Sequence, residues 1–109
     1  MKMIYAIVQD EDAGKTLSGL TKNGFSVTRL ATSGGFLRAG NTTLLVGVED
    51  DQVDKALKII EEHSRSRKQM VPSTGSVSGV ESGLHAGPMQ VTVGGATVFV
   101  VPVEKFLRL

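Results

Sequence analysis

The sequence of 109 residues contains no cysteine and no tryptophan, with one tyrosine and four phenylalanines. The absence of cysteine excludes disulfides, thiolate metal sites and thiol nucleophiles, and it is typical of a reducing compartment such as the cytoplasm. A charge excess is also missing, because 12 basic residues face 11 acidic ones. Without a broad positive field the chain has little to hold a nucleic acid backbone, so we predict a cytoplasmic protein that does not bind nucleic acid.

Long hydrophobic runs are absent as well. The apolar run near the start of the sequence extends only from Met3 to Val8 and is followed at once by a polar residue and acidic ones. It is shorter than the core of a signal peptide and much shorter than a membrane span. The sequence therefore predicts a soluble protein without membrane association, and its length corresponds to a single domain, residues 1–109, with one core.

The first half of the chain predicts three strands and one helix. Side chains typical of β-structure dominate three segments, which we expect to be strands: residues 2–9, 25–32 and 42–48. Apolar residues at helical spacing follow the first of them, and they predict a helix that Asp10 or Asp12 caps and that ends at Gly24. Alternation along the second strand places Thr28 on the face opposite Phe25.

The second half predicts a helix, a long loop and a hairpin. The segment 49–68 opens with acidic residues, closes with basic ones and carries an apolar stripe, as expected for an amphipathic helix. Residues 72–88 are mostly Ser, Gly, Thr and Pro, so we predict a long flexible loop over about 69–88. A hairpin signal follows, made of two strands and a two-residue turn: residues 89–93, Gly94-Gly95 and residues 96–103.

The order of these elements is strand, helix, strand, strand, helix, strand, strand. Its first six members match the βαββαβ plan of ferredoxin-like folds, and the seventh is an additional C-terminal strand. The predicted fold class is therefore α+β.

Motifs for catalysis and metal binding are incomplete. The sequence AGKT at residues 13–16 resembles the end of a phosphate-binding P-loop, but Gln9 stands where that motif needs glycine. His63 and His85 lack metal-ligand spacing, which favours structural or solvated roles. No nucleophile motif accompanies the serines. We predict that the protein is not an enzyme and holds no metal and no cofactor.

The stretch TSGGFLRAGNTT, residues 32–43, has residue types complementary to a nucleotide. Glycine N–H groups can converge on phosphate oxygens, Phe36 offers a ring face to a base, and Asn41 and Thr28 can bond a base edge. Gly47, inside the next strand, is typical of a close approach by a ligand or another backbone. A hairpin tip whose Phe36 folds back on the core explains the composition of the loop equally well.

Three separated stretches resemble one known family, in matching order: MKMIYAIVQDED at 1–12, LATSGGFLRAGNTTLLVGVEDDQVD at 30–54 and VGGATVFVVPVEKF at 93–106. They are similar to the PII-like cyclic di-AMP receptors of low-GC Gram-positive bacteria, the PstA and DarA type. The likeness leaves out mainly the Ser- and Gly-rich loop. A short connection between the second and third strands and a long one after the second helix also fit that family.

The resemblance implies a homotrimer that binds one cyclic di-AMP in each cleft between neighbouring subunits. Phe36 and Leu37 would flank an adenine, Asn41 and the Gly35 amide would serve polar edges or phosphate, and Gly47 would permit close approach. By matching position, the residues implied around the ligand are Thr28, Gly35, Phe36, Leu37, Asn41, Gly47 and Gly94. Some relatives carry larger polar side chains where this chain has Gly24 and Ser26, which implies weaker or water-mediated contacts to one adenine.

Our leading hypothesis is a signal-transduction receptor in which cyclic di-AMP changes the conformation of the long loop for an unknown protein target to read. The alternative is a PII-like adaptor that senses ATP or another mononucleotide, although the long connection expected between its second and third strands is missing. A single-stranded RNA-binding module is a further reading, but the chain has no cluster of aromatic residues that resembles a stacking platform.

Overall fold

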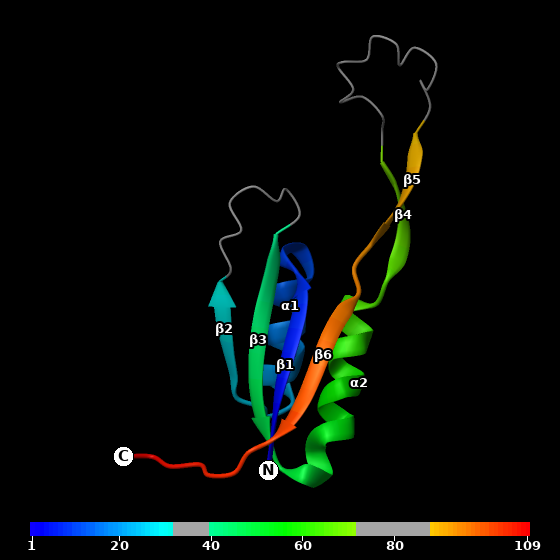
Figure 1. Cartoon of the computed structure of the whole chain (residues 1–109). Coiled ribbons are helices and arrows are strands. Elements are labelled where there is room, and N and C mark those ends of the chain that lie inside the picture. Colours follow the sequence, from blue (N-terminus) through cyan, green and yellow to red (C-terminus); the bar gives the residue numbers. More distant parts are fainter. Residues whose placement is uncertain (32–39, 72–87) are drawn as a thin grey trace.

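The structure is a computed structural model that describes residues 1–31, 40–71 and 88–109 (Figure 1). It contains strands, two α-helices and a short 3-10 helix, η1. In chain order the elements are β1 (Lys2–Gln9), α1 (Asp10–Lys22), β2 (Val27–Ala31), β3 (Asn41–Val48), η1 (Asp50–Gln52), α2 (Val53–Ser64), β4 (Arg67–Val71), β5 (Met89–Val93) and β6 (Ala96–Pro102).

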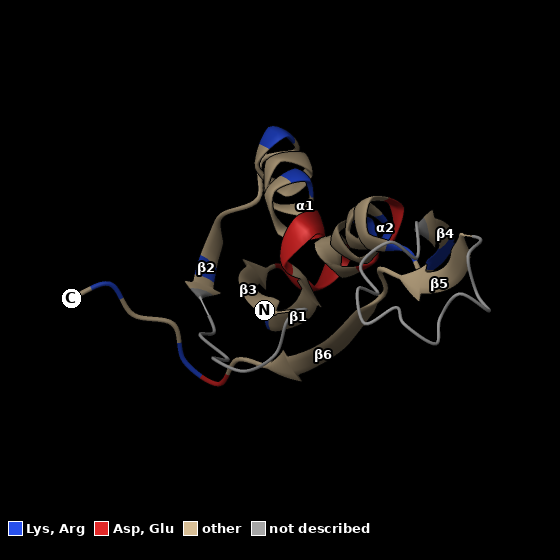
Figure 2. Ribbon diagram, turned by 90° about the horizontal axis from the view of Figure 1, so that it is seen from above, with Lys and Arg blue, Asp and Glu red and all other residues tan. Residues whose placement is uncertain are grey.

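The body of the molecule is a four-stranded sheet in the order β2-β3-β1-β6, with every neighbouring pair antiparallel. Both helices lie side by side on one face of this sheet, α1 behind β3 and β1 and α2 behind β6 (Figures 1 and 2). The predicted α+β class and ferredoxin-like plan are confirmed. A second sheet contains only β4 and β5, and this two-stranded arm extends away from the body.

The identity of the last strands differs from the prediction. The fourth strand of the ferredoxin-like sheet is β6, which pairs with β1 from Lys2–Pro102 to Val8–Ala96. Residues 89–93 instead pair with β4, so Gly94 and Gly95 connect two sheets and do not close a hairpin. Alternation along a segment predicts that it is a strand, but the choice of partner depends on long-range packing.

The second helix is shorter than predicted, because α2 ends at Ser64 and the next residue is already extended, with φ −59° and ψ 149°. The predicted range 49–68 therefore includes Arg67 and Lys68, which belong to β4. The predicted loop of about 69–88 also begins with strand residues, up to Val71. Residues 72–87 of that loop lie outside the described residues.

The ends of α1 are partly as predicted. The residue before the helix is Gln9, with no side-chain cap, and Asp10 and Asp12 occupy the first turn, where their charge favours the helix dipole. The prediction that one of them caps the helix is wrong. Gly24 follows the helix end with φ +86°, in the conformation that favours glycine, so the predicted stop is confirmed.

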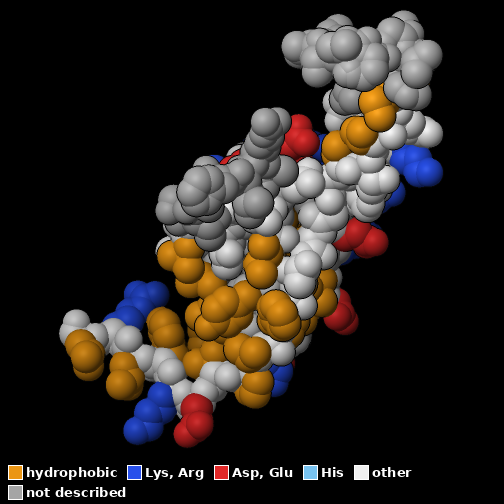
Figure 3. All heavy atoms as spheres, turned by 45° about the horizontal axis from the view of Figure 1, so that its top comes forward, with side chains coloured by type: hydrophobic (Ala, Val, Ile, Leu, Met, Phe, Trp, Pro, Cys, Tyr) orange, Lys and Arg blue, Asp and Glu red, His pale blue; other side chains and the backbone are white. Residues whose placement is uncertain are grey.

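The core lies between the sheet and the two helices. Alternate residues of β1 and β3 point into it, and the largest fully buried apolar side chains are Ile4, Val8, Leu20, Leu44, Val46 and Ile60. Their neighbours along the strands point to the opposite face, which no described element covers. That open face carries Tyr5, Leu30 and Phe99 at 39%, 45% and 55% exposure. Figure 3 shows hydrophobic side chains gathered over the body.

Candidate functional site

The structure describes four of the predicted ligand-binding residues. Thr28 lies in β2, Asn41 is the first residue of β3, Gly47 lies near the end of β3, and Gly94 joins β5 to β6. The remaining three, Gly35, Phe36 and Leu37, lie outside the described residues.

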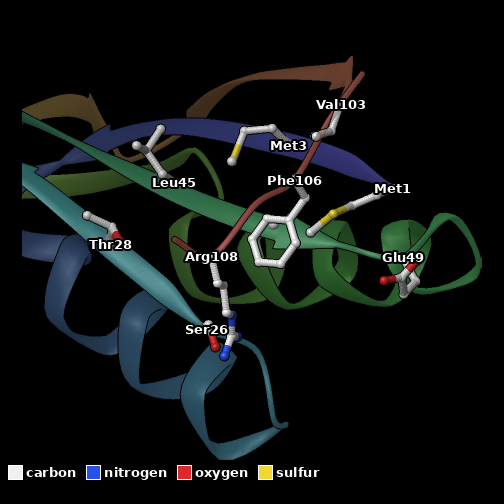
Figure 4. A pocket seen from close by; sticks show the side chains of 10 residues that line it. Met1, Met3, Ser26, Thr28, Leu45, Glu49, Val103, Phe106 and Arg108 are labelled. Atoms are coloured by element: carbon white, nitrogen blue, oxygen red, sulfur yellow. The ribbon is translucent and has the colours of Figure 1, made fainter.

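Thr28 and Gly47 line the same pocket, which has a volume of about 440 Å³ and opens on the uncovered face of the sheet (Figure 4). The strand register explains their proximity, because Thr28 pairs with Leu45 and Gly47 pairs with Met3 across adjacent strands. The full lining consists of Met1, Met3, Ser26, Thr28, Leu45, Gly47, Glu49, Val103, Phe106 and Arg108.

Gly47 leaves the wall of this pocket open. A Cβ at this position would meet only the methyl groups of Met1 and Met3, at 3.4 and 4.0 Å, which is ordinary contact. The subunit itself therefore does not require glycine here. A requirement for glycine would come from a molecule that enters the pocket and approaches the β3 backbone.

The chain after β6 contributes pocket residues that the sequence did not predict. The Val103 N–H donates a hydrogen bond of 3.0 Å to the Met1 carbonyl, which starts the tail beside the N-terminus. Phe106 and Arg108 then line the pocket, with the guanidinium carbon 5.6 Å from the ring centre. The sequence feature that could have indicated this part of the site is an aromatic residue two positions before a cation, after the last strand.

Asn41 and Gly94 lie at the other end of the sheet. Asn41 pairs with Gln9, and the Gln9 Oε1 accepts a hydrogen bond of 2.8 Å from the Gly94 N–H. Gly47 is six residues further along β3 than Asn41, which corresponds to about 20 Å at the usual rise of a strand. A single subunit therefore separates the predicted residues into two groups, Thr28 with Gly47 and Asn41 with Gly94.

A buried ion pair lies next to the second group. The Asp12 carboxylate is fully buried, and Arg67 donates to both of its oxygens at 3.0 and 3.2 Å, while the Lys15 ammonium lies at 3.3 Å. Figure 2 shows the acidic first turn of α1 to which Asp12 belongs. Burial raises the pKa of Asp12, but hydrogen bonds from Arg67 and Lys15 lower it more, so the pKa lies below its ordinary value of 3.8.

We expect this ion pair to make stability depend on acid pH. A carboxyl whose pKa is lower in the folded chain stabilises the fold above its unfolded pKa, and this stabilisation is lost as the pH falls from 3.8 toward the folded value. In urea unfolding, the free-energy difference between the wild type and Asp12→Asn should be constant near neutral pH and should decrease below pH 3.8. A difference that stays constant down to pH 3 would contradict the assignment.

Residues 1–31, 40–71 and 88–109 show no other kind of site among those considered below. Within these ranges no three His, Cys, Asp or Glu side chains are arranged to hold a metal ion. Every buried side-chain nitrogen or oxygen in the described parts of the chain has a hydrogen-bond partner. No helix in these parts of the chain is both long enough and apolar enough to cross a membrane.

The antiparallel sheet with two helices on one face defines an α+β protein of the ferredoxin-like class. The chain belongs to the cyclic-di-AMP receptor family, whose model matches residues 1–109. It is also similar to a protein of unknown function from Pediococcus pentosaceus known from a crystal structure. The two are 37% identical, the match covers 99% of this chain and 96% of the other, and the TM-score is 0.78.

Proposed function

We propose that the protein is a non-catalytic receptor that binds cyclic di-AMP and signals its presence to another protein. The observation that carries this proposal is the match of the receptor family to the whole length of the chain. The pocket supports it from the structure, because Thr28 and Gly47, two of the residues predicted around the ligand, line one pocket together. Arg108 adds a cation to that pocket, which suits a phosphate group.

We propose further that the receptor is a homotrimer. The open face of the sheet presents exposed apolar side chains on adjacent strands, including Tyr5 on β1 and Phe99 on β6, which pair with one another. Exposed apolar surface of this kind marks an interaction site. Covering it with other copies of the chain would remove these side chains from water.

A trimer also explains why the predicted ligand residues form two groups in one subunit. Along the strands, Gly47 lies about 20 Å from Asn41, and Thr28, which pairs with Leu45, lies about 13 Å from it. We propose that each cleft joins the Thr28–Gly47 pocket of one subunit to the Asn41–Gly94 end of its neighbour. The Phe36 and Leu37 side chains would enter the cleft with the second group, and the ligand would be shared between subunits.

The direct test is isothermal titration with cyclic di-AMP, in parallel with cyclic di-GMP, linear di-adenylate and ATP. We expect saturable heat with cyclic di-AMP, at one ligand per subunit. Light scattering should give a particle with three times the mass of a single chain. Heat with ATP and none with cyclic di-AMP would instead favour the mononucleotide-sensing adaptor. No heat with any of the ligands would overturn the receptor function.

Phe36→Ala is expected to weaken cyclic di-AMP binding by about 5- to 150-fold, because stacking on an aromatic ring contributes about 1–3 kcal/mol per base. Leu107→Ala is the matched control, since Leu107 is exposed and does not line the pocket. Both affinities are measured by the same titration. An unchanged affinity in Phe36→Ala would remove Phe36 from the site.

We propose that the bound state is communicated through the long connection after β4, in which residues 72–87 lie outside the described residues. Cyclic di-AMP can shift this segment only if it binds two of its conformations with different affinity. A protein target that distinguishes these conformations would then read the ligand state.

A further inference from the structure

The junction of β1 and α1 contacts three other segments of the chain. β1 ends at Gln9 and α1 begins at the next residue, Asp10, without a connecting loop. The side chains of Gln9, Asp10 and Asp12 each bond a different segment: the connection of β5 to β6, the start of β3, and the start of β4. These three contacts lie within four consecutive residues of the junction.

The contact with β3 involves both the backbone and the side chain of Asp10. Its N–H donates to the Gly40 carbonyl at 3.0 Å, and its Oδ1 accepts a hydrogen bond of 2.6 Å from the buried Thr42 hydroxyl. Gly40 packs against the same carboxylate so closely that a Cβ there would collide with it. The two residues on either side of Asn41, a predicted ligand residue, are therefore both held by Asp10.

The other two contacts hold both strands of the β4–β5 arm at its base. Arg67, the first residue of β4, is fixed by the bidentate ion pair with Asp12, and Gly94, directly after β5, is fixed by Gln9. Gly94 has φ +83°, and a Cβ on it would collide with the Arg67 guanidinium and the Arg65 carbonyl. The two anchors therefore pack against each other.

The part of the arm beyond its base does little to fix the direction of the arm relative to the four-stranded sheet. Among the described residues, β4 and β5 pair only with one another, and an isolated pair of strands is marginally stable in water. The Gly95 N–H also bonds the Ser64 carbonyl at the end of α2, which adds a further contact at the base of the arm. The base of the arm is consequently held by Gln9 and Asp12, the neighbours in sequence of Asp10, which holds the start of β3.

We propose that the β1–α1 junction couples the Asn41 end of β3 to the β4–β5 arm, with Asp12 and Arg67 as positioning residues that do not contact the ligand. The inference rests on the proposed function for its role in signalling, because a ligand at Asn41 would act on Asp10 through Gly40 and Thr42. A shift of the β1–α1 junction, which carries both Gln9 and Asp12, would then move both anchors of the arm together. Coupling of this kind is reciprocal, so the arm would also affect the ligand end of β3.

The coupling can be tested first without any ligand, by hydrogen exchange of the β4 and β5 amides in the full chain. Thr42→Val removes the hydroxyl that bonds Asp10 and keeps the shape of the side chain. We expect it to speed exchange in the arm by about 3- to 10-fold, although Thr42 lies in another sheet. Thr43→Val on the opposite face of β3 is the matched control. Thr42→Ser keeps a hydroxyl at this position, so the arm of that variant should exchange as slowly as in the wild type.

Arg67→Gln should speed exchange in the arm by about tenfold or more, because it removes a charged hydrogen-bonded pair. Lys68→Gln, at the next residue of β4, is its control. Combining Arg67→Gln with Thr42→Val should speed exchange no further, since the connection is already broken. Unchanged exchange in the arm of Thr42→Val, or strictly additive effects in the double variant, would overturn the coupling.

Addition of cyclic di-AMP separates this proposal from the receptor function. We expect the ligand to change exchange in the wild-type arm and to have no such effect in Arg67→Gln. If cyclic di-AMP gives heat of binding but leaves hydrogen exchange in the wild-type arm unchanged, the coupling is overturned and the receptor function is intact. An absence of heat would overturn the receptor function, and the Thr42→Val result would still decide whether the junction couples the two segments.

Discussion

Tyr5→Glu is expected to reduce the mass of the particle in solution threefold, to the 11.5 kDa of one chain. Tyr5 lies on the inner strand β1, and its partners in the register are Leu45 on β3 and Phe99 on β6. A carboxylate at this position would be buried without a partner when the open faces associate, at a cost of several kcal/mol. In the separate subunit the same carboxylate would remain in contact with water, so the fold should be retained.

The loss of assembly should also abolish binding of cyclic di-AMP, because the proposed cleft needs two subunits. Light scattering and titration on the same sample measure both effects. Tyr5→Phe, which keeps the aromatic ring, should remain assembled and bind the ligand. A Tyr5→Glu particle of unchanged mass would show that the subunits meet through another surface.

Leu44→Ala is expected to lower the free energy of unfolding by about 2–5 kcal/mol, the usual cost of emptying a core position. Leu44 is fully buried between the sheet and the helices. Domains of this kind have a total stability of about 5–15 kcal/mol, so the variant would lose a large fraction of it. Urea unfolding, followed by circular dichroism, measures the change.

Leu45→Ala provides the comparison for Leu44→Ala, because the next residue of β3 points to the open face and lines the pocket. To separate folding from assembly, both variants should be compared in the Tyr5→Glu background. Leu45→Ala should there cost much less stability than Leu44→Ala. Equal losses for the two substitutions would contradict the assignment of the two faces.

Much of the fold could be predicted from the sequence because alternation and helical periodicity are local properties. β1 was predicted with its observed bounds, and β3 differs from the predicted strand only by the addition of Asn41. The pairing of β5 with β4 could not be predicted from such patterns, since strand partners are chosen by contacts between distant segments. The end of α2 at Ser64 was not predicted either, since Arg67, three residues beyond it, bonds Asp12 in a distant segment.

The site was predicted less completely than the fold. The register of β2 and β3 brings Thr28 and Gly47 to one pocket, but their roles toward a ligand stay predictions. Phe106 and Arg108 were missed because an aromatic residue and a cation after β6 do not by themselves indicate which strands they lie beside. The placement of Gly94 with Asn41 was also not visible, since it depends on the pairing of β1 with both β3 and β6.

In the part of the chain that the structure describes, β4 and β5 pair only with each other, which has a consequence for how such receptors can diverge. The described residues of this arm beyond its base contribute no side chain to the buried core. Substitutions or changes of length there would leave the sheet and the pocket as they are. Under the proposed function, the same body could acquire new targets by changing the arm alone, provided that Arg67 and Gly94 keep its base in place.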